Sequence, residues 1–539
     1  MINKAIFLLV IILAVFLRVV RIDQIPPGIY LDEASIGYDA YSLGLRGKDQ
    51  YGASFPVYFR SYANYQSPLY IYLSLLPVKF LGLKPLGIRL VSILSGVVLV
   101  IMTYFLLKLI DEKDNSHLPL FGSLIIAISP WAILFSRSAL EANLALSIFA
   151  SSLFLLFYGI NNKKKHLFLL GLIFLAMTNY AYHSYRLISI VTIIIFAVLF
   201  YRKLPATFKK FFILGFLSTV LLLIPQVILL NSPGSLKRLS SLEYTSGEYF
   251  DKYGGDFRSL PLGRFVFISN EFLAKYFDYL SPKSLFFDSD PTAVRSIPDL
   301  GAFYPWMAIP FFVGLVTTIK FLRNPIIIFL GLIGLISIIP AAITRDNLYL
   351  LRTLSYLWII SIIISLGCKK IVDFIKNNFL KILLLGSMLI ISLGNIYINY
   401  FNILKNERKI EHSGLLNDLF RYTKSQQNNK FIVDLTEPLS FGVALFIYQY
   451  NPDKFEDSLG FDLKDYYSNT TLKTQHHINN LDIRPIDWEI DLRKDIFLVG
   501  DEQTIPEYKA VDNNLTLVNK FGTVLDGRYI SIYKTKDHH

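Results

Sequence analysis

The stretch "IPPGIYLDEASIGYDAYSLGLRG", residues 25–47, follows an apolar run at 5–22 that is long enough to cross a membrane. It carries a carboxylate pair, Asp32 and Glu33, a few residues beyond the membrane exit. Small and apolar residues then recur at helical spacing, and the dipole of a helix N-terminus tolerates anions. The stretch therefore predicts a helix that begins with two carboxylates at the edge of a bilayer.

The composition indicates a polytopic membrane protein. Of 539 residues, 53% are hydrophobic and only 17% are charged, which is far too apolar for an ordinary soluble chain. About eleven apolar runs reach the roughly 17 to 25 residues that a spanning helix needs. They lie at 5–22, 86–109, 118–136, 142–160, 167–182, 186–201, 211–230, 304–322, 325–343, 350–367 and 380–401.

The charges in the connections predict the topology. With the N-terminus in the cytoplasm, four inner connections are rich in Lys or Arg, as the positive-inside rule requires, whereas the connection at 111–117 gives no such signal. The four are 161–166, 202–210, 320–324 and 368–381. An odd number of spans places loops 23–85 and 231–303 and the C-terminal segment outside a plasma or inner membrane. The first span lacks a small-residue cleavage site, so we expect a retained anchor.

The chain is expected to have two domains, a transmembrane domain at 1–401 and a small extracytoplasmic α/β domain at 402–539. The second carries 17 Lys and Arg against 21 Asp and Glu, so the net charge of +12 comes from the membrane part and does not indicate a nucleic-acid partner. Its pattern predicts strands at 430–435 and 495–501, a helix at 441–450, and a hairpin at 515–534 that turns at Asp526-Gly527. A lone cysteine, Cys368, excludes an intrachain disulfide.

Both long outer loops are expected to be structured. The first contains "SYANYQSPLYIYLSLLPVKFLGL" at 61–83, which together with the acidic stretch predicts two helices lying at the membrane interface. The second contains a helical segment at 264–280. The second loop, 231–303, is too long for a structureless connection, so we expect this loop to have a function.

The region around the first two spans resembles a known family, and three further stretches support the resemblance. The Pro-Pro and acidic pair, the segment "YQSPLYIYL" and Arg89 in "GIRLVSILSG" occur in this order around the first two spans. The order resembles the integral-membrane glycosyltransferases of the GT-C fold, nearest to the bacterial branch of the protein O-mannosyltransferase and aminoarabinose-transferase superfamily. The supporting stretches are "SPWAILFSRSALEANLALSIFA" (129–150), "NYAYHSYRL" (179–187) and "TRDNLYLLRTL" (344–354).

The resemblance implies transfer of a sugar from a polyprenyl-phosphate carrier, with Asp32 as the general base. Such a transfer passes through an oxocarbenium-like state, and the phosphate leaves as an anion that needs no general acid. One carboxylate that deprotonates the acceptor hydroxyl is then sufficient. Glu33 either orients Asp32, holds a cation or caps the helix. Glu141 is either a further catalytic residue or the ion-pair partner of Arg137.

The leaving phosphate needs cationic donors in a site of low dielectric. The candidates for the donor phosphate or substrate are Arg89, Arg137, Tyr182, His183, Arg186, Arg345, Tyr349 and Arg352. Their alternative role is interfacial anchoring, with long side chains that reach the headgroups and an aromatic belt. His183 is either an ordinary hydrogen-bonding residue or a metal or acceptor contact. A divalent cation therefore stays an open possibility, although no Cys/His metal signature is present.

The predicted function is that of a membrane glycosyltransferase that acts on an envelope acceptor, which is a lipid-linked glycan, a polysaccharide or a protein. Two alternatives stay open, a transporter or flippase of lipid-linked sugars and a non-catalytic glycan-binding membrane scaffold. A transporter tends to have inverted repeats and charged residues at the midplane of broken helices.

Overall fold

The computed structural model describes residues 2–62, 64–111, 116–230, 244–320, 323–460, 462–468, 471–522 and 527–535. The protein is mainly helical and divides into two compact units, each formed by two separate stretches of chain. The first unit comprises Met1–Val20 and Arg89–Leu404, and the second comprises Arg21–Ile88 and Lys405–His539. The first long loop and the C-terminal segment thus belong to the same unit, and the predicted domains at 1–401 and 402–539 stay a prediction.

Most helices associated with the first unit follow the predicted apolar runs, and the three between residues 247 and 286 lie in the predicted loop 231–303. They are α1 (Ile2–Val19), α4 (Pro85–Ile110), α5 (Leu118–Ile128), α6 (Pro130–Ser136), α7 (Glu141–Asn161), α8 (Lys165–Ala181), α9 (Tyr185–Phe200), α10 (Ala206–Leu230), α12 (Gly247–Tyr253), α13 (Gly263–Leu280), α14 (Pro282–Phe286), α15 (Ala308–Lys320), α16 (Pro325–Ile336), α17 (Ile339–Ala342), α18 (Leu354–Phe374) and α19 (Asn378–Asn395). Short 3-10 helices lie at Ala293–Arg295 (η3), before α15, and at Leu350–Thr353 (η5), before α18. A π-helical segment spans Ile396–Ile403.

The chain is a multi-pass membrane protein. Among the described residues, seven helices are long and apolar enough to cross a bilayer, or eight if α5 and α6 form one span. Each of the eleven predicted runs falls on helix, but several helices are shorter than a full span, so the count of eleven stays a prediction. The run at 118–136 is bent by 58° between α5 and α6, because Pro130 has no N–H with which to continue the helix.

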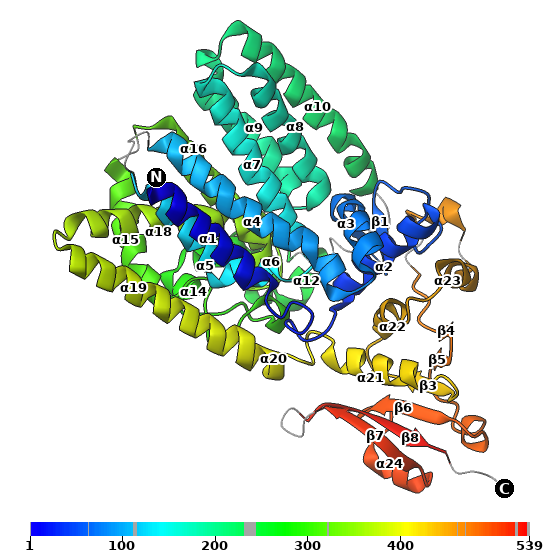
Figure 1. Cartoon of the computed structure of the whole chain (residues 1–539). Helices are drawn as coiled ribbons and strands as arrows, with labels where there is room; N and C mark the ends of the chain where they lie inside the picture. Colours follow the sequence, from blue (N-terminus) through cyan, green and yellow to red (C-terminus); the bar gives the residue numbers. More distant parts are fainter. Residues whose placement is uncertain are drawn as a thin grey trace. The chain divides into compact units, whose positions relative to one another are not determined.

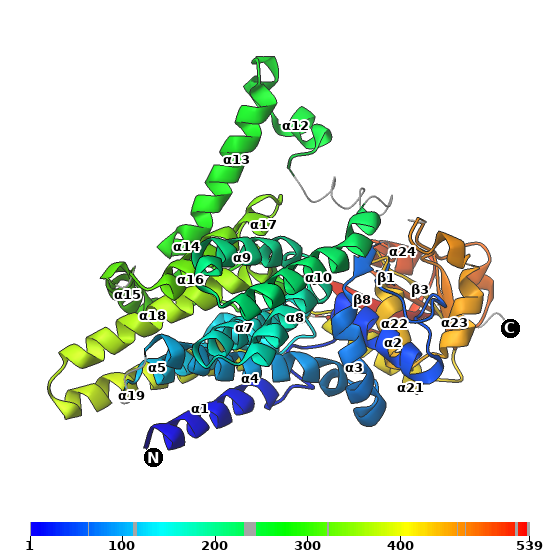
Figure 2. The ribbon, with the colours of Figure 1, turned by 90° about the horizontal axis from the view of Figure 1, so that it is seen from above.

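Helix α18 lies at the centre of the first unit. In the most apolar part of the span that contains α18, 89% of the residues are buried. In the last span, which begins with α19, the corresponding share is 11%. Two glycines let α15 approach α18 closely, as small residues do in membrane helix pairs: a Cβ on Gly314 would lie 2.0 Å from the Ile363 carbonyl oxygen, and one on Gly367 would lie 1.7 Å from that of Pro310. Figure 2 shows α13 extending beyond the other helices of this unit, with α14 and α17 near its base.

The second unit combines helices from the first loop with a mixed sheet (Figure 1). The loop supplies α2 (Leu31–Arg46), α3 (Pro68–Leu81) and the small ribbon β1 (Phe59–Ser61) and β2 (Asn64–Gln66). The C-terminal segment supplies α21 (Gly414–Ser425), β3 (Phe431–Asp434), α22 (Ser440–Tyr448), α23 (Pro452–Leu459), β4 (His476–Ile478), β5 (Leu481–Ile483), β6 (Phe497–Asp501), α24 (Glu507–Asp512), β7 (Thr516–Gly522) and β8 (Tyr529–Lys534).

The six-stranded sheet has the order β4-β5-β3-β6-β8-β7, and β3 runs parallel to both of its neighbours. The predicted strands, the helix between them and the hairpin strands are all present, whereas Asp526 of the predicted turn lies outside the described residues. The sequence analysis missed β4 and β5, which are only three residues long. Leu498 and Tyr533 form a buried apolar cluster with Ala510 of α24, and α21 contacts β7 and β8.

The first loop belongs to the second unit because its helix α2 packs against α3 and α22. The Tyr38 hydroxyl of α2 donates to the Tyr450 carbonyl at 3.1 Å, and a Cβ on Gly37 would lie 2.7 Å from Phe446. Helices α2 and α3 confirm that the loop has two helices, but the start of the predicted segment 61–83 belongs to the ribbon of β1 and β2 instead. Their location at a membrane interface stays a prediction, although α3 exposes Leu76 and Phe80.

Candidate functional site

The predicted acidic pair opens α2, but its two carboxylates have different surroundings. Glu33 is 1% exposed, and its Oε2 accepts the backbone N–H of Tyr30 at 3.2 Å, which satisfies one of the free donors at the start of the helix. Asp32 is exposed in the same first turn. Capping, one of the roles considered for Glu33, is thus present in the structure, and Asp32 remains accessible to a substrate.

A second carboxylate pair, missed by the sequence analysis, lies deeper in the same unit. Asp39 of α2 is fully buried, and its two oxygens accept the backbone N–H and the side-chain amide of Gln50 at 3.0 and 3.1 Å. Asp49 is also fully buried; it accepts two backbone N–H groups and the hydroxyl of Tyr466. The local sequence pattern does not distinguish these aspartates from surface residues, so the pair is seen only in the packed tertiary structure.

Burial changes the proton affinity of this pair. It raises the pKa of Asp49 to about 6, against the hydrogen bond from Tyr466, which lowers it. Burial also raises the pKa of Asp39 well above its usual range, and the nearby Asp49 charge raises it further. The pair therefore holds at least one proton more readily than two isolated aspartates.

In the first unit, the loop before α18 gathers several predicted residues around Tyr349. Two guanidinium groups lie against its ring, with the Cζ of Arg295 at 3.5 Å and the Cζ of Arg352 at 4.2 Å from the ring centroid. Arg295, which the sequence analysis missed, forms an ion pair with buried Asp290 at 3.1 Å. Asp290 also accepts the backbone N–H of Leu350 at 3.2 Å, which fixes the turn between Tyr349 and Arg352.

The two arginines on this ring differ in their partners. Arg352 is 6% exposed, and its Nε is buried without a hydrogen-bond partner. In the part of the chain that the structure describes, no carboxylate pairs with it, whereas Arg295 has Asp290. A buried cation without an anion costs free energy, and a planar guanidinium suits a phosphate. Arg352 is therefore the strongest anion-binding candidate of the predicted set.

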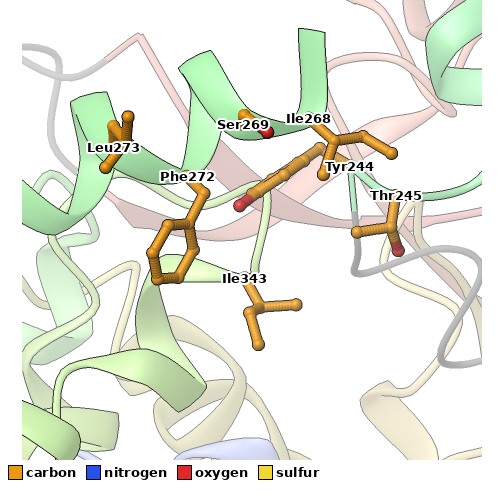
Figure 3. A pocket seen from close by; sticks show the side chains of 7 residues that line it. All are labelled: Tyr244, Thr245, Ile268, Ser269, Phe272, Leu273 and Ile343. Carbon is orange, nitrogen blue, oxygen red and sulfur yellow. The ribbon is translucent and has the colours of Figure 1, made fainter. Parts of the chain in front are cut away.

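The same loop continues toward an apolar cavity of about 400 Å³ between α13 and the end of α17. Figure 3 shows Phe272 reaching from α13 toward Ile343, with the ring of Tyr244 nearby. Two cations lie beside it: Lys275 donates to the carbonyl of Arg345 at 2.7 Å, and Arg345 donates to Ser246 at 3.0 Å. Burial lowers the pKa of Lys275, whereas the carboxylates around it raise it.

Arg137 has a different environment. Its two terminal nitrogens donate to the carbonyls of Leu17 and Val20 at 2.8 Å, at the C-terminal end of α1, and its guanidinium lies over the rings of Tyr400 and Phe401. Cations at this end of a helix stabilise it. These contacts give Arg137 a structural role that the substrate-binding prediction did not include.

The remaining predicted residues lie at the ends of α4, α7 and α9. Arg89 is fully buried near the start of α4, and Glu141 is half-buried in the first turn of α7. Tyr182 and His183 have ring centroids 4.1 Å apart in the turn before α9, and Arg186 follows them. This turn is held near the Arg352 loop, because Tyr185 and Ser355 share a hydrogen bond of 2.7 Å.

Arg18 was also missed. It is fully buried and donates from the last turn of α1 to the carbonyls of Ile126 and Ala127 at 3.3 and 3.2 Å, just before the bend between α5 and α6. The periodicity of an apolar span gives no sign of such a long-range contact. Within the described ranges, no group of three or more His, Cys, Asp or Glu side chains lies together as a metal site.

The fold of the chain is the GT-C fold, as its likeness to solved structures shows. Among solved structures, apo ArnT from Cupriavidus metallidurans aligns with 98% of this chain and 97% of its own length, with a TM-score of 0.56 and 10% identity. ArnT from the same organism bound to undecaprenyl phosphate aligns over the same shares with a TM-score of 0.53 and 10% identity.

An apo oligosaccharyltransferase from Archaeoglobus fulgidus also aligns, with a TM-score of 0.48, 13% identity and 83% of this chain covered. The chain spans 63% of the length of that protein. No protein-family model and no curated protein sequence matches the chain. The predicted fold resemblance is confirmed.

Proposed function

We propose that the chain is a membrane glycosyltransferase that takes a sugar from a polyprenyl-phosphate carrier on the outer face of the membrane. The acceptor is a lipid-linked glycan, an envelope polysaccharide or a protein. Asp32 is the general base, and Arg352, with Tyr349, Arg345 and Lys275 nearby, holds the donor phosphate.

The observation that carries the proposal is the buried guanidinium of Arg352. It lies against Tyr349 and has no carboxylate partner among the described residues, so a ligand anion would remove the cost of burying it. A phosphate accepts two parallel N–H donors from one guanidinium. The ring of Tyr349 fixes the guanidinium plane and so reduces the entropy lost on binding.

The apolar cavity beside α13 supports a lipid-borne donor. Its lining is made by residues such as Ile268, Phe272 and Leu273, which suits a prenyl chain, and Lys275 lies one helical turn beyond Phe272. ArnT, whose fold is similar, has been solved with undecaprenyl phosphate bound. An apolar cavity flanked by cations favours an amphiphilic anion over a soluble sugar nucleotide.

The chemistry needs little more than these groups and one base. Asp32 is exposed in the first turn of α2, where it can accept the proton of an acceptor hydroxyl while Glu33 holds the turn in place. The acceptor oxygen then forms the new bond to the anomeric carbon as the bond to the phosphate breaks. The fold favours this transfer reaction over the transporter and scaffold alternatives.

The test is transfer of radiolabelled sugar from polyprenyl-phosphate donors by the full chain in nanodiscs. Asp32→Asn removes the base and should lower turnover by about 10²-fold or more, since general base catalysis contributes 10²- to 10⁴-fold. Asp512→Asn is the matched control, because Asp512 is an exposed carboxylate of the same unit. Turnover of Asp32→Asn at the wild-type rate would contradict the assignment of the base.

A further inference from the structure

The ribbon of β1 and β2 lies against α2, whose first turn carries Asp32. The hydroxyl of Tyr62, which lies between the two strands, donates to the carbonyl of Leu31 at 3.0 Å. The hydroxyls of Ser61 and Ser35 share a hydrogen bond of 2.9 Å. Leu31 and Ser35 lie one helical turn apart on the same face of the helix. The ribbon thus holds α2 on both sides of Asp32 along the chain.

Tyr62 has an unusual backbone conformation. Its φ is 53°, in the left-handed region, which bulky residues adopt only at a cost and which glycine or asparagine adopts more readily in a turn. Its side chain is nevertheless buried, with 8% exposed. Residues in such conformations cluster at functional sites, where the surrounding contacts offset the strain. The position of Tyr62 therefore indicates a role for its side chain.

Helix α22 of the C-terminal segment fixes the position of this side chain. The ring of Phe441 lies edge-on to the ring of Tyr62, with centroids 5.7 Å apart and an interplanar angle of 82°. A Cβ on Gly442 would overlap the Tyr62 hydroxyl oxygen, so glycine at this position leaves room for the hydroxyl. Residues from two distant parts of the chain therefore meet at the turn that carries Asp32.

The hydroxyl of Tyr62 keeps its proton at neutral pH. Burial raises the pKa of Tyr62 well above its usual range, and the negative charge of nearby Asp32 raises it further; the charges of Asp39 and Glu437 act in the same direction. A tyrosine with so high a pKa cannot serve as a general base, but it can donate a hydrogen bond. Its chemistry therefore suits a residue that positions the base and does not itself accept the proton.

We propose that Tyr62 is a positioning residue for Asp32, held in place by Phe441 and Gly442. Its hydrogen bond to Leu31 keeps the first turn of α2 in the orientation in which the Asp32 carboxylate reaches the acceptor hydroxyl. This role of Tyr62 rests on the proposed function, in which Asp32 is the general base. The C-terminal segment then takes part in the transfer step, because a displacement of about 1 Å at a reacting group can lower turnover about 10²-fold.

The test measures kcat and KM for transfer of radiolabelled sugar by the full chain in nanodiscs. Tyr62→Phe keeps the ring and removes the hydroxyl, so kcat should fall about tenfold. The KM for the polyprenyl-phosphate donor should stay within about twofold of the wild-type value, because the donor phosphate is assigned to Arg352.

Two double variants show whether Tyr62 acts through the proposed partners. In the Asp32→Asn background, Tyr62→Phe should cause no further fall in kcat, since the base that the hydroxyl positions is already absent. Gly442→Ala places a methyl group against the hydroxyl and should lower kcat about as much as Tyr62→Phe does. The combination of Tyr62→Phe with Gly442→Ala should be no slower than Tyr62→Phe alone, because phenylalanine lacks the oxygen that the methyl group overlaps.

Two further substitutions are matched controls. Tyr72→Phe removes another hydroxyl of the first loop, which donates to the carbonyl of Pro56 at 2.7 Å. Gly44→Ala adds a methyl group to α2 itself, where a Cβ would lie 3.9 Å from Leu75. Both variants should keep the wild-type kcat, and thermal unfolding checks that all the variants compared are folded.

A fall in kcat that disappears in the Asp32→Asn background supports the proposal. It is overturned if Tyr62→Phe has the wild-type kcat, or if Tyr62→Phe lowers kcat by the same factor with and without Asp32. If the folded wild-type protein transfers no sugar, the proposed function fails and the role of Tyr62 fails with it. Transfer by the wild type at a rate that Tyr62→Phe leaves unchanged refutes the role of Tyr62 alone.

Discussion

The two arginines that lie against Tyr349 provide the most direct test of the donor site. Arg352→Gln and Arg295→Gln remove the same charged group from the same ring, at 4.2 and 3.5 Å from its centroid. Arg352 has no acidic partner among the described residues, whereas Arg295 pairs with the buried Asp290 and, at 3.9 Å, with Asp346. Arg295→Gln should therefore destabilise the ligand-free protein, whereas Arg352→Gln should not.

The magnitudes follow from the partners. Burial of an unpaired ion costs several kcal/mol, and a cation–π contact returns about 0.5 to 2 kcal/mol. Arg352→Gln should thus leave the free energy of unfolding unchanged or raise it by about 1–2 kcal/mol. Arg295→Gln leaves Asp290 buried without its cation and should lower the free energy by about 3–5 kcal/mol. Undecaprenyl phosphate binding should weaken about 10- to 100-fold in Arg352→Gln, since a charged hydrogen bond contributes about 1.5–3 kcal/mol.

The assay combines thermal unfolding of the purified full chain with titration of undecaprenyl phosphate in nanodiscs. Arg258→Gln is a control, because Arg258 is exposed. The reasoning is refuted if Arg352→Gln destabilises the ligand-free chain as much as Arg295→Gln does. It is also refuted if Arg352→Gln binds the lipid as tightly as wild type.

Three further predictions concern stability. The pKa of Asp49 is raised to about 6 from about 3.9 in the unfolded chain, so the folded state binds more protons between these values, and stability should fall by about 2–3 kcal/mol as the pH rises from about 4 to 6. Glu33→Gln weakens the helix cap and should cost about 1 kcal/mol. Arg137→Gln removes two hydrogen bonds to the end of α1 and should cost about 3 kcal/mol while lipid binding persists.

Each of these three predictions has a matched comparison. Asp49→Asn removes the titrating group, so the fall in thermal stability between pH 4 and 6 should become smaller; an unchanged fall would assign it to other groups. Glu33→Gln should keep its transfer activity far better than Asp32→Asn, and equal losses would give Glu33 a catalytic role. If Arg137→Gln abolishes lipid binding at temperatures where it is folded, Arg137 belongs to the donor site.

Much of the fold was predictable because its signals are local. In the part of the chain that the structure describes, the predicted apolar runs fall on helices, the strands at 430–435 and 495–501 are present, and the helix predicted after the acidic pair is α2. Hydropathy, proline positions and helix-start residues act within a few neighbours along the chain. The short strands β4 and β5 escaped because three residues are too few for a recognisable alternation.

The site was predictable only in part. Arg352 and Tyr349 were found by resemblance, but Arg295, Asp290 and Lys275 were not, since they lie in a segment without a motif. Their importance arises from contacts between residues about 60 to 70 positions apart, such as Asp290 with Leu350 and Lys275 with Arg345. No sequence window contains both partners.

The sequence by itself determined the membrane class, the positions of the helices and the presence of an acidic helix start, because hydropathy and capping depend on neighbouring residues. Tertiary structure alone decided that the first loop packs with the C-terminal segment and that Asp39 and Asp49 form a buried pair. It also decided that Arg137 caps α1 while Arg352 is buried without a carboxylate partner among the described residues. The physical reason is that the free energy of a charge depends on its burial and on the partners that folding brings to it from distant parts of the chain.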